Sequence, residues 1–371
     1  MRERYKDLTV LHLIPNSWRA RMACLALAAA ACSSDSTTAP PNRQNQFDAA
    51  KVSANVATIE RVAATPIIDA WAHLADFLGS TARTSPGLAP QNGATRLITT
   101  IRRLASTTGA DRGVFLVPVI RTGVLGTTYV YDATTQQYVA DPNRNGAPAN
   151  GVRFVLYETA ANGAIMPATE IGHADLIDEK AASTSSAGLR FEVVSGTTTV
   201  LDYAFEIGGS FVSPTIDITG YISDGTDRVN FDLATHAPAW ETAGPFELEA
   251  ELTVPSTGFT VHASLSGTAL PEPSSNVELT LDSGTDKLEV SAATEQGQID
   301  ATVKVNGAVF ATVQGPASNP TIAGEGGRDL TQDEWSALAK VVEFTDGVFA
   351  LLGRLLAPAG VLLAIALGLH P

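Results

Sequence analysis

The sequence predicts an α+β protein dominated by β-structure, in which a large curved antiparallel meander sheet packs against N-terminal helices and an apolar C-terminal helix. Apolar residues recur at helical spacing over 46–107, alternate with polar residues over 108–320, and return to helical spacing over 328–371. Short turns between the alternating segments require antiparallel neighbours. The alternative is a β-sandwich, because a second sheet could cover the apolar face instead of the terminal segments.

The chain begins with a segment organised like an export signal. Arg19 and Arg21 precede a short apolar run, Met22–Ala31, and Cys32 follows this run directly. A polar tract rich in Ser, Thr and Pro comes next, which is typical of a flexible linker. In an ordinary cleaved signal, Cys32 would be incidental. The run is also far shorter than the roughly 20 apolar residues that span a bilayer.

Small residues, then Cys32, then a polar tract resemble a bacterial lipoprotein signal, although Ala29 stands where such signals usually have an aliphatic residue. The resemblance implies that 1–31 are removed as a signal peptide and that Cys32 becomes the lipidation site. Residues 32–45 would then be a tether between the lipid and the body. Ser33 after the Cys implies the outer membrane, because lipoproteins kept in the inner membrane often have Asp there.

Two helices are expected in the helical segment 46–107, and a shorter third helix is plausible at Ala94–Ser106. Thr65-Pro66 offers an N-cap followed by Pro at the first position of the second helix. The apolar stripes of the first two helices consist of Val52, Val56, Ile59 and Val62, and of Ile68, Trp71, Leu74, Ala75 and Leu78.

The antiparallel β domain, 108–320, is expected to contain about a dozen strands or slightly more. In one strand, Phe246, Leu248 and Ala250 share a face while Glu247, Glu249 and Glu251 share the other. Asn306-Gly307 between two apolar runs is a strong signal for a two-residue hairpin. One face of the sheet is therefore expected to be buried, and the other to be solvent-exposed and acidic.

The C-terminal segment, 328–371, is expected to form a capped helix followed by an apolar helix that packs on the sheet. Thr331 and Glu334 fit a capping box, with Leu330 and Trp335 at the positions of a hydrophobic staple. After Asp346-Gly347 the chain is apolar on all sides, which is typical of a helix buried in protein or in lipid. Its uncharged part is short for a membrane span, so a helix buried against the sheet is favoured over a membrane-inserted tail.

Charge and cysteine content exclude several classes of function. The chain carries 24 basic and 39 acidic residues. Loss of 1–31, with five basic and two acidic residues, leaves a net charge of −18. Such a surface repels phosphates, so no nucleic-acid partner is expected. Cys24 leaves with the signal and Cys32 would be acylated, so the body has no thiol for a disulfide, a metal site or a nucleophile.

No catalytic residue, cofactor or metal site is assigned from the sequence. Asp141, Asn143 and Asn145 match the start of a calcium loop, but Val152 stands where the loop needs an acidic residue, so a turn explains the string better. His173 lies in a polar string that could supply a base, yet no nucleophile is specified nearby. Phosphate-binding, dinucleotide-binding and nucleophile-elbow motifs are missing.

Three hypotheses of function remain, and the ligand-binding residues are unknown in all of them. The predicted body resembles, in architecture only, the half-barrel bodies of periplasmic lipoproteins and lipid carriers. This implies a lipid-anchored, non-catalytic cell-envelope protein that binds an apolar ligand or lipid between sheet and helix. The alternative is a surface scaffold with a solid core, whose protein partner meets the acidic face. The third is a hydrolase, which would show clustered polar residues with shifted pKa values.

Overall fold

The computed structural model describes residues 49–80, 120, 122–160, 164–179, 187–210, 213–236, 245–268 and 274–366. The predicted signal, Cys32, the tether and the short helix expected at Ala94–Ser106 lie outside these residues.

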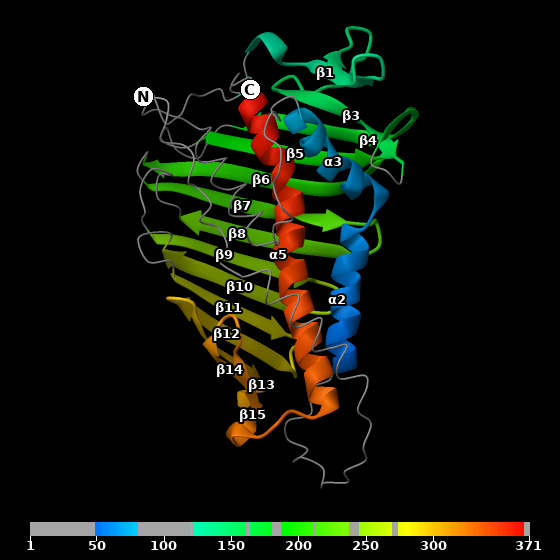
Figure 1. Cartoon of the computed structure of the whole chain (residues 1–371). Helices are drawn as coiled ribbons and strands as arrows, with labels where there is room; N and C mark the ends of the chain where they lie inside the picture. Colours follow the sequence, from blue (N-terminus) through cyan, green and yellow to red (C-terminus); the bar gives the residue numbers. More distant parts are fainter. Residues whose placement is uncertain are drawn as a thin grey trace.

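The described strands form one open sheet of fifteen (Figure 1). From one edge to the other the order is β15 to β3 without interruption, followed by β1 and then β2. The strands are β1 Thr127–Asp132, β2 Gln137–Ala140, β3 Gly151–Thr159, β4 Ile165–Glu179, β5 Ala187–Ser195, β6 Thr198–Ser210, β7 Ser213–Ser223, β8 Arg228–His236, β9 Pro245–Val254, β10 Phe259–Thr268, β11 Ser274–Asp282, β12 Lys287–Glu295, β13 Gln298–Val305, β14 Ala308–Pro316 and β15 Thr321–Gly324.

The sheet confirms the prediction of a β-dominated α+β protein with a large antiparallel meander, and the described strands are not divided into the two layers of a sandwich. Tight turns enforce the antiparallel pairing, as at Asn306-Gly307, where both residues have positive φ. One pair was not predicted: β1 runs parallel to β3. The reason is that β2 reverses the chain beside β1, and the loop after β2 reverses it again before β3.

Three helices lie on one face of the sheet, here called the helix-covered face (Figure 1). They are α2 Ala49–Ala63, α3 Pro66–Ser80 and α5 Gln332–Ala366. Short 3-10 turns, η2 Thr122–Val124 and η3 Glu325–Gly327, complete the described elements. The opposite side of the sheet is called the polar face.

The predicted helix starts at Pro66 and after Thr331 are confirmed. The carbonyl oxygen of Thr65 accepts hydrogen bonds from the backbone N–H groups of Ile68 and Asp69, each at 3.0 Å. The buried Thr65 hydroxyl has no hydrogen-bond partner, so Thr65 does not cap through its side chain. Thr331 does cap: its Oγ1 accepts from the backbone N–H of Glu334 at 3.3 Å, and Glu334 Oε2 accepts from the backbone N–H of Thr331 at 2.8 Å.

The C-terminal segment differs from expectation because α5 is one continuous helix of 35 residues, where a capped helix and a separate apolar helix were expected. Asp346-Gly347 lies inside this helix. Val348, Leu351 and Leu352 are buried and belong to the main hydrophobic core together with residues of the sheet. In the described part of the chain, no helix combines the length and the hydropathy that a membrane span requires.

The core lies between the helices and the sheet. Trp71 of α3 meets Phe191 edge to face, and Phe191 stacks on Tyr203 with ring centroids 4.9 Å apart. Tyr203 then contacts Phe231 on β8. Gly220 lies opposite Tyr203 in the pairing of β6 with β7, and a Cβ there would come within 2.3 Å of the Tyr203 Cβ. The glycine therefore makes room for the aromatic row.

Candidate functional site

A hollow of about 570 Å³ opens on the polar face above β4 to β9. It exists because two small side chains, Ala204 and Thr219, face each other across β6 and β7 while longer side chains surround them. Alternation along each strand places these side chains opposite the buried ones. The side chains that line the hollow come from strands that are far apart in the sequence. They are brought together by the register in which these strands pair.

The first wall is an ion pair between neighbouring strands. Arg190 on β5 donates from Nε and Nη2 to the two carboxylate oxygens of Asp202 on β6, both at 2.7 Å. Glu179 lies 3.9 Å from the same guanidinium. The Asp202 hydrogen bonds are the largest cause that raises the pKa of Arg190. This bidentate geometry fixes the guanidinium in place. The positive charge of Arg190 is therefore already neutralised by Asp202.

The second wall holds a cation against an aromatic ring. The guanidinium of Arg228 lies 3.6 Å from the centroid of the Tyr221 ring, and its Nε donates to Asn230 Oδ1 at 2.6 Å. Tyr221 and Asn230 face each other across β7 and β8. The face of an aromatic ring attracts positive charge, and the Arg228 guanidinium already occupies this position on the Tyr221 ring.

The third wall is acidic. Asp232 on β8 faces Glu251 on β9, and no Lys or Arg among the described residues forms an ion pair with either carboxylate. Partial burial of Asp232 raises the pKa of its carboxyl, and the charges of Glu251 and Asp217 raise it further. His262 Nδ1 lies 3.3 Å from Glu251 Oε2. The wall therefore holds negative charge that the protein compensates weakly.

The hollow can accept a positively charged polar group. Of its four acidic residues, Asp202 is paired with Arg190, whereas neither Asp232 nor Glu251 forms an ion pair with an arginine or lysine in the described part of the chain. A metal ion fits poorly, because the described residues contain no group of three His, Cys, Asp or Glu that could hold one. A pair of facing carboxylates could also do acid–base chemistry, but both side chains are open to water, which screens them.

The predicted polar string around His173 lies on the same face, towards β3. Arg153 donates from Nε and Nη2 to the carboxylate of Asp175, both at 2.7 Å, and His173 Nε2 lies 3.9 Å from Asp175 Oδ2. Burial is the largest cause that lowers the pKa of His173, and the charge of Arg153 lowers it further, against opposing contributions from Asp175 and Glu192. Asp175 is bound by an arginine, so this cluster is a structural ion pair beside an imidazole whose pKa is lowered.

The weak calcium candidate forms a turn. Asp141 Oδ1 accepts a hydrogen bond from the backbone N–H of Asn143 at 2.9 Å, and Arg144 Nε lies 3.9 Å from Asp141 Oδ2. Arg144 also pairs with Glu170. Asn143 and Asn145 are exposed. A hydrogen bond from the Asp side chain to the backbone two residues on is the usual property of such a turn, so a turn explains this string.

The sequence indicates a solvent-exposed acidic face but gives no direct sign of the hollow. The alternation of Glu247, Glu249 and Glu251 correctly indicated which side chains share a face. Nothing in the sequence indicates that Glu251 meets Asp232 or that Arg190 meets Asp202, because these pairs depend on register. The small residues Ala204 and Thr219 inside a run of longer side chains were the one available signal.

Comparison with known proteins gives no match: no family model, no curated protein and no solved structure is similar to this chain.

Proposed function

We propose that this protein is a lipid-anchored, non-catalytic protein of the cell envelope that binds a positively charged polar group on the polar face of its sheet. The anchor would be the acylated Cys32, with the outer membrane as destination. The protein is then an interaction protein, whose body is held near the membrane by its tether.

The hollow between Arg190, Tyr221 and Asp232 is the observation that supports binding at the polar face. Its carboxylates at Asp232 and Glu251 gain stabilisation from an incoming cation, while the ring of Tyr221 already carries one. An ammonium or guanidinium group, free or on a basic segment of a partner protein, has this chemistry. The high negative charge of the chain adds long-range attraction for such a partner.

A second candidate function is the binding of an apolar ligand or lipid between the sheet and the helices, as in a half-barrel carrier. The observation that favours it is the helix-covered face, where a long helix with an apolar C-terminal half crosses a curved fifteen-stranded sheet. Side chains there, such as Val254 and Phe259, are fully buried, which is what a filled core requires. Surface binding is therefore the better-supported proposal.

Binding of short synthetic peptides by the full chain tests the proposal. We expect a tri-arginine amide to bind at low salt and a tri-glutamate peptide to show no binding. Ala204→Trp should fill the hollow and weaken binding of the arginine peptide at least about tenfold, a loss of about 1.4 kcal/mol. Ser291→Trp, on an exposed site of the same face outside the hollow, is the matched control. Equal affinity of both tryptophan variants would refute the hollow as the site.

Mass spectrometry of the membrane-purified protein tests the anchor and the second candidate. We expect an acylated N-terminal peptide beginning at Cys32, and Cys32→Ser should move the protein to the soluble fraction. A stoichiometric co-purified lipid beyond the acyl chains would favour the apolar-ligand candidate over surface binding. An N-terminus at another residue, without acylation, would contradict the lipid anchor.

A further inference from the structure

Strand β8 presents a cation, an amide and an acid to the hollow on the polar face. Arg228, Asn230 and Asp232 alternate along the strand with Val229 and Phe231, which are buried on the opposite side. All three polar side chains line the hollow. Asn230 lies between the two charged residues, so one strand carries both signs of charge at separate positions of the same hollow.

The cation of this set, Arg228, is not neutralised by a carboxylate. Its guanidinium lies on the Tyr221 ring and its Nε donates to Asn230 Oδ1. In the described part of the chain, no acidic side chain pairs with Arg228 and its two terminal nitrogens form no hydrogen bond. Arg190, in contrast, is bound at both carboxylate oxygens of Asp202. Arg228 is therefore a positioned guanidinium whose two terminal nitrogens can still donate to a ligand.

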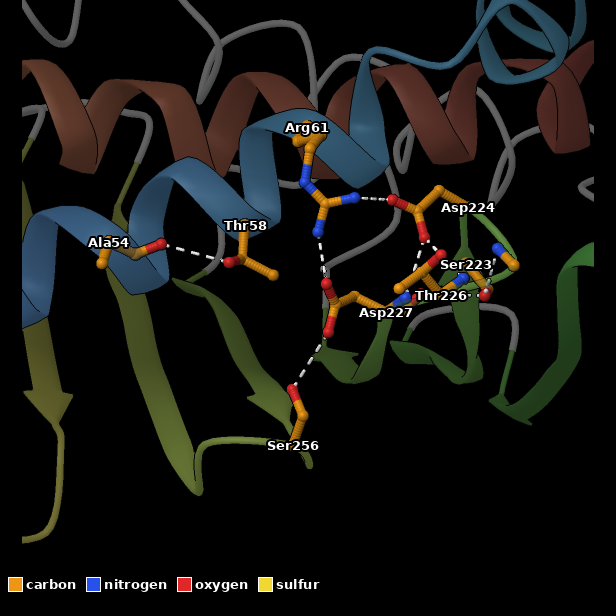
Figure 2. A network of polar contacts seen from close by, with 9 residues as sticks. Ala54, Thr58, Arg61, Ser223, Asp224, Thr226, Asp227 and Ser256 are labelled. Atoms are coloured by element: carbon orange, nitrogen blue, oxygen red, sulfur yellow. Dashed lines mark hydrogen bonds and ion pairs between the residues drawn. The ribbon is translucent and has the colours of Figure 1, made fainter.

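The acids that precede Arg228 in the sequence are bound by another cation (Figure 2). Asp224 and Asp227 both form ion pairs with Arg61 of α2. Asp224 Oδ1 also accepts from the backbone N–H of Asp227 at 2.8 Å, and the Ser256 hydroxyl donates to Asp227 Oδ1 at 3.2 Å. These contacts hold the turn that leads into β8 and leave Arg228 without an acidic partner.

The acids of the hollow are also left without a strong cation. Asp232 and Glu251 face each other across β8 and β9, and neither pairs with an arginine or lysine among the described residues. The contacts of Glu251 are His262 Nδ1, at 3.3 Å, and the Thr253 hydroxyl, at 3.2 Å. An unpaired guanidinium and unpaired carboxylates thus line one hollow of about 570 Å³ without neutralising each other.

We infer that the hollow binds a small zwitterion, a molecule with an amine and a carboxylate joined by a short carbon chain. Its carboxylate accepts two hydrogen bonds from Arg228, because a planar guanidinium matches the two oxygens of a carboxylate. Its ammonium group lies against Asp232 and Glu251. This inference rests on the proposed binding of a cation at the polar face, and it adds an anionic group on the same molecule.

Two matched probes, titrated into the full chain at low salt and followed by ligand-observed NMR, test the inference. Both 4-aminobutanoate and butylamine carry one ammonium group, but only 4-aminobutanoate has a carboxylate. We expect 4-aminobutanoate to bind at least about threefold more tightly. The negative charge of the whole chain favours butylamine, so a preference for the zwitterion requires a local cation.

Arg228→Gln should abolish this preference, so that the two probes bind equally. Lys304→Gln removes a cation from an exposed position of β13 outside the hollow, and as the matched control it should keep the preference. Asp232→Asn should weaken the binding of both probes, because it removes a partner of the ammonium group. Circular dichroism should show that the three variants stay folded.

The outcomes separate this inference from the proposed function. Equal binding of the two probes by the wild type, or a preference that survives Arg228→Gln, would overturn the zwitterion while leaving cation binding intact. If the arginine peptide and both probes all fail to bind, the proposed function itself is overturned.

Vesicles of phosphatidylethanolamine distinguish a lipid headgroup from a free zwitterion, because this headgroup combines an ammonium group with a phosphate. We expect the unacylated full chain not to sediment with them. Sedimentation that Arg228→Gln abolishes would overturn the assignment to a free zwitterion and identify a headgroup as the ligand.

Discussion

At the scale of single residues, the capping box of α5 makes part of the stability depend on pH. The hydrogen bond from Arg328 is the largest cause that lowers the pKa of Glu334 from 4.5 to about 2, and Thr331 lowers it further. Because this pKa is lower in the folded chain than in the unfolded chain, the contribution is present above about pH 4.5 and is lost as the pH falls towards 2.

Glu334→Gln should therefore destabilise the protein at pH 7, and the difference from the wild type should shrink between pH 4.5 and pH 2. Urea unfolding over this pH range measures it. Asp333→Asn changes a neighbouring acid in the same first turn and serves as the control. A difference between Glu334→Gln and wild type that stays constant across the range would contradict the role given to Arg328.

Gly220 is required because its neighbours leave no space for a side chain. An added Cβ would come within 2.3 Å of both the Asp202 carbonyl oxygen and the Tyr203 Cβ. We expect Gly220→Ala to cost about 1–3 kcal/mol through overpacking of the aromatic row, measured by denaturant unfolding. Gly123→Ala, where the new Cβ meets nothing within 4 Å, should be close to neutral. Equal effects of the two substitutions on stability would show that Tyr203 shifts without cost to make room for the new Cβ at position 220.

At the scale of elements, helix starts were predictable and helix continuation was not. The capping box at Thr331 and the proline at Pro66 are local signals, and both mark real starts. A capped helix before Asp346-Gly347 and an apolar helix after it were expected, and glycine does cost a helix interior about 1 kcal/mol relative to alanine. The buried residues Val348 and Leu351 that follow Gly347 offset this cost through packing, which no local pattern indicates.

Gly347→Ala should accordingly stabilise α5. The position is exposed, lies within the helix, and offers open space for a Cβ. We expect a gain of about 0.5–1 kcal/mol, which thermal unfolding would show as a higher midpoint. Gly258→Ala is a useful contrast, because the φ of +68° at that turn should make the same substitution destabilising. A loss of stability for Gly347→Ala would mean that α5 is not helical at that point.

At the scale of the whole molecule, periodicity predicted a single large sheet because each strand carries its own alternation and most of the turns are short. The parallel contact of β1 with β3 could not be predicted, because it depends on how a ten-residue loop returns past β1. The hollow could not be predicted either, since Arg190, Tyr221 and Asp232 meet only through the pairing of four strands. Long-range register is the information that local patterns lack.

The C-terminal half of α5 is the element on which the whole core is expected to depend. Val348, Leu351 and Leu352 are each at most 6% exposed and pack into the main cluster. Loss of one buried leucine typically costs about 2–5 kcal/mol, and native domains have only about 5–15 kcal/mol in total. Removal of residues 348–371 should therefore abolish cooperative unfolding and expose an apolar surface that binds a hydrophobic dye.

Leu351→Ala tests the same dependence with a smaller change. It should lower the free energy of unfolding by about 2–5 kcal/mol while the chain stays folded. Leu351 faces the core, whereas Lys340 on the same helix is exposed, so Lys340→Ala should change stability by less than about 0.5 kcal/mol. A truncated chain that unfolds cooperatively at the wild-type midpoint would mean that the sheet, α2 and α3 form a sufficient core, and that the end of α5 serves a purpose other than packing.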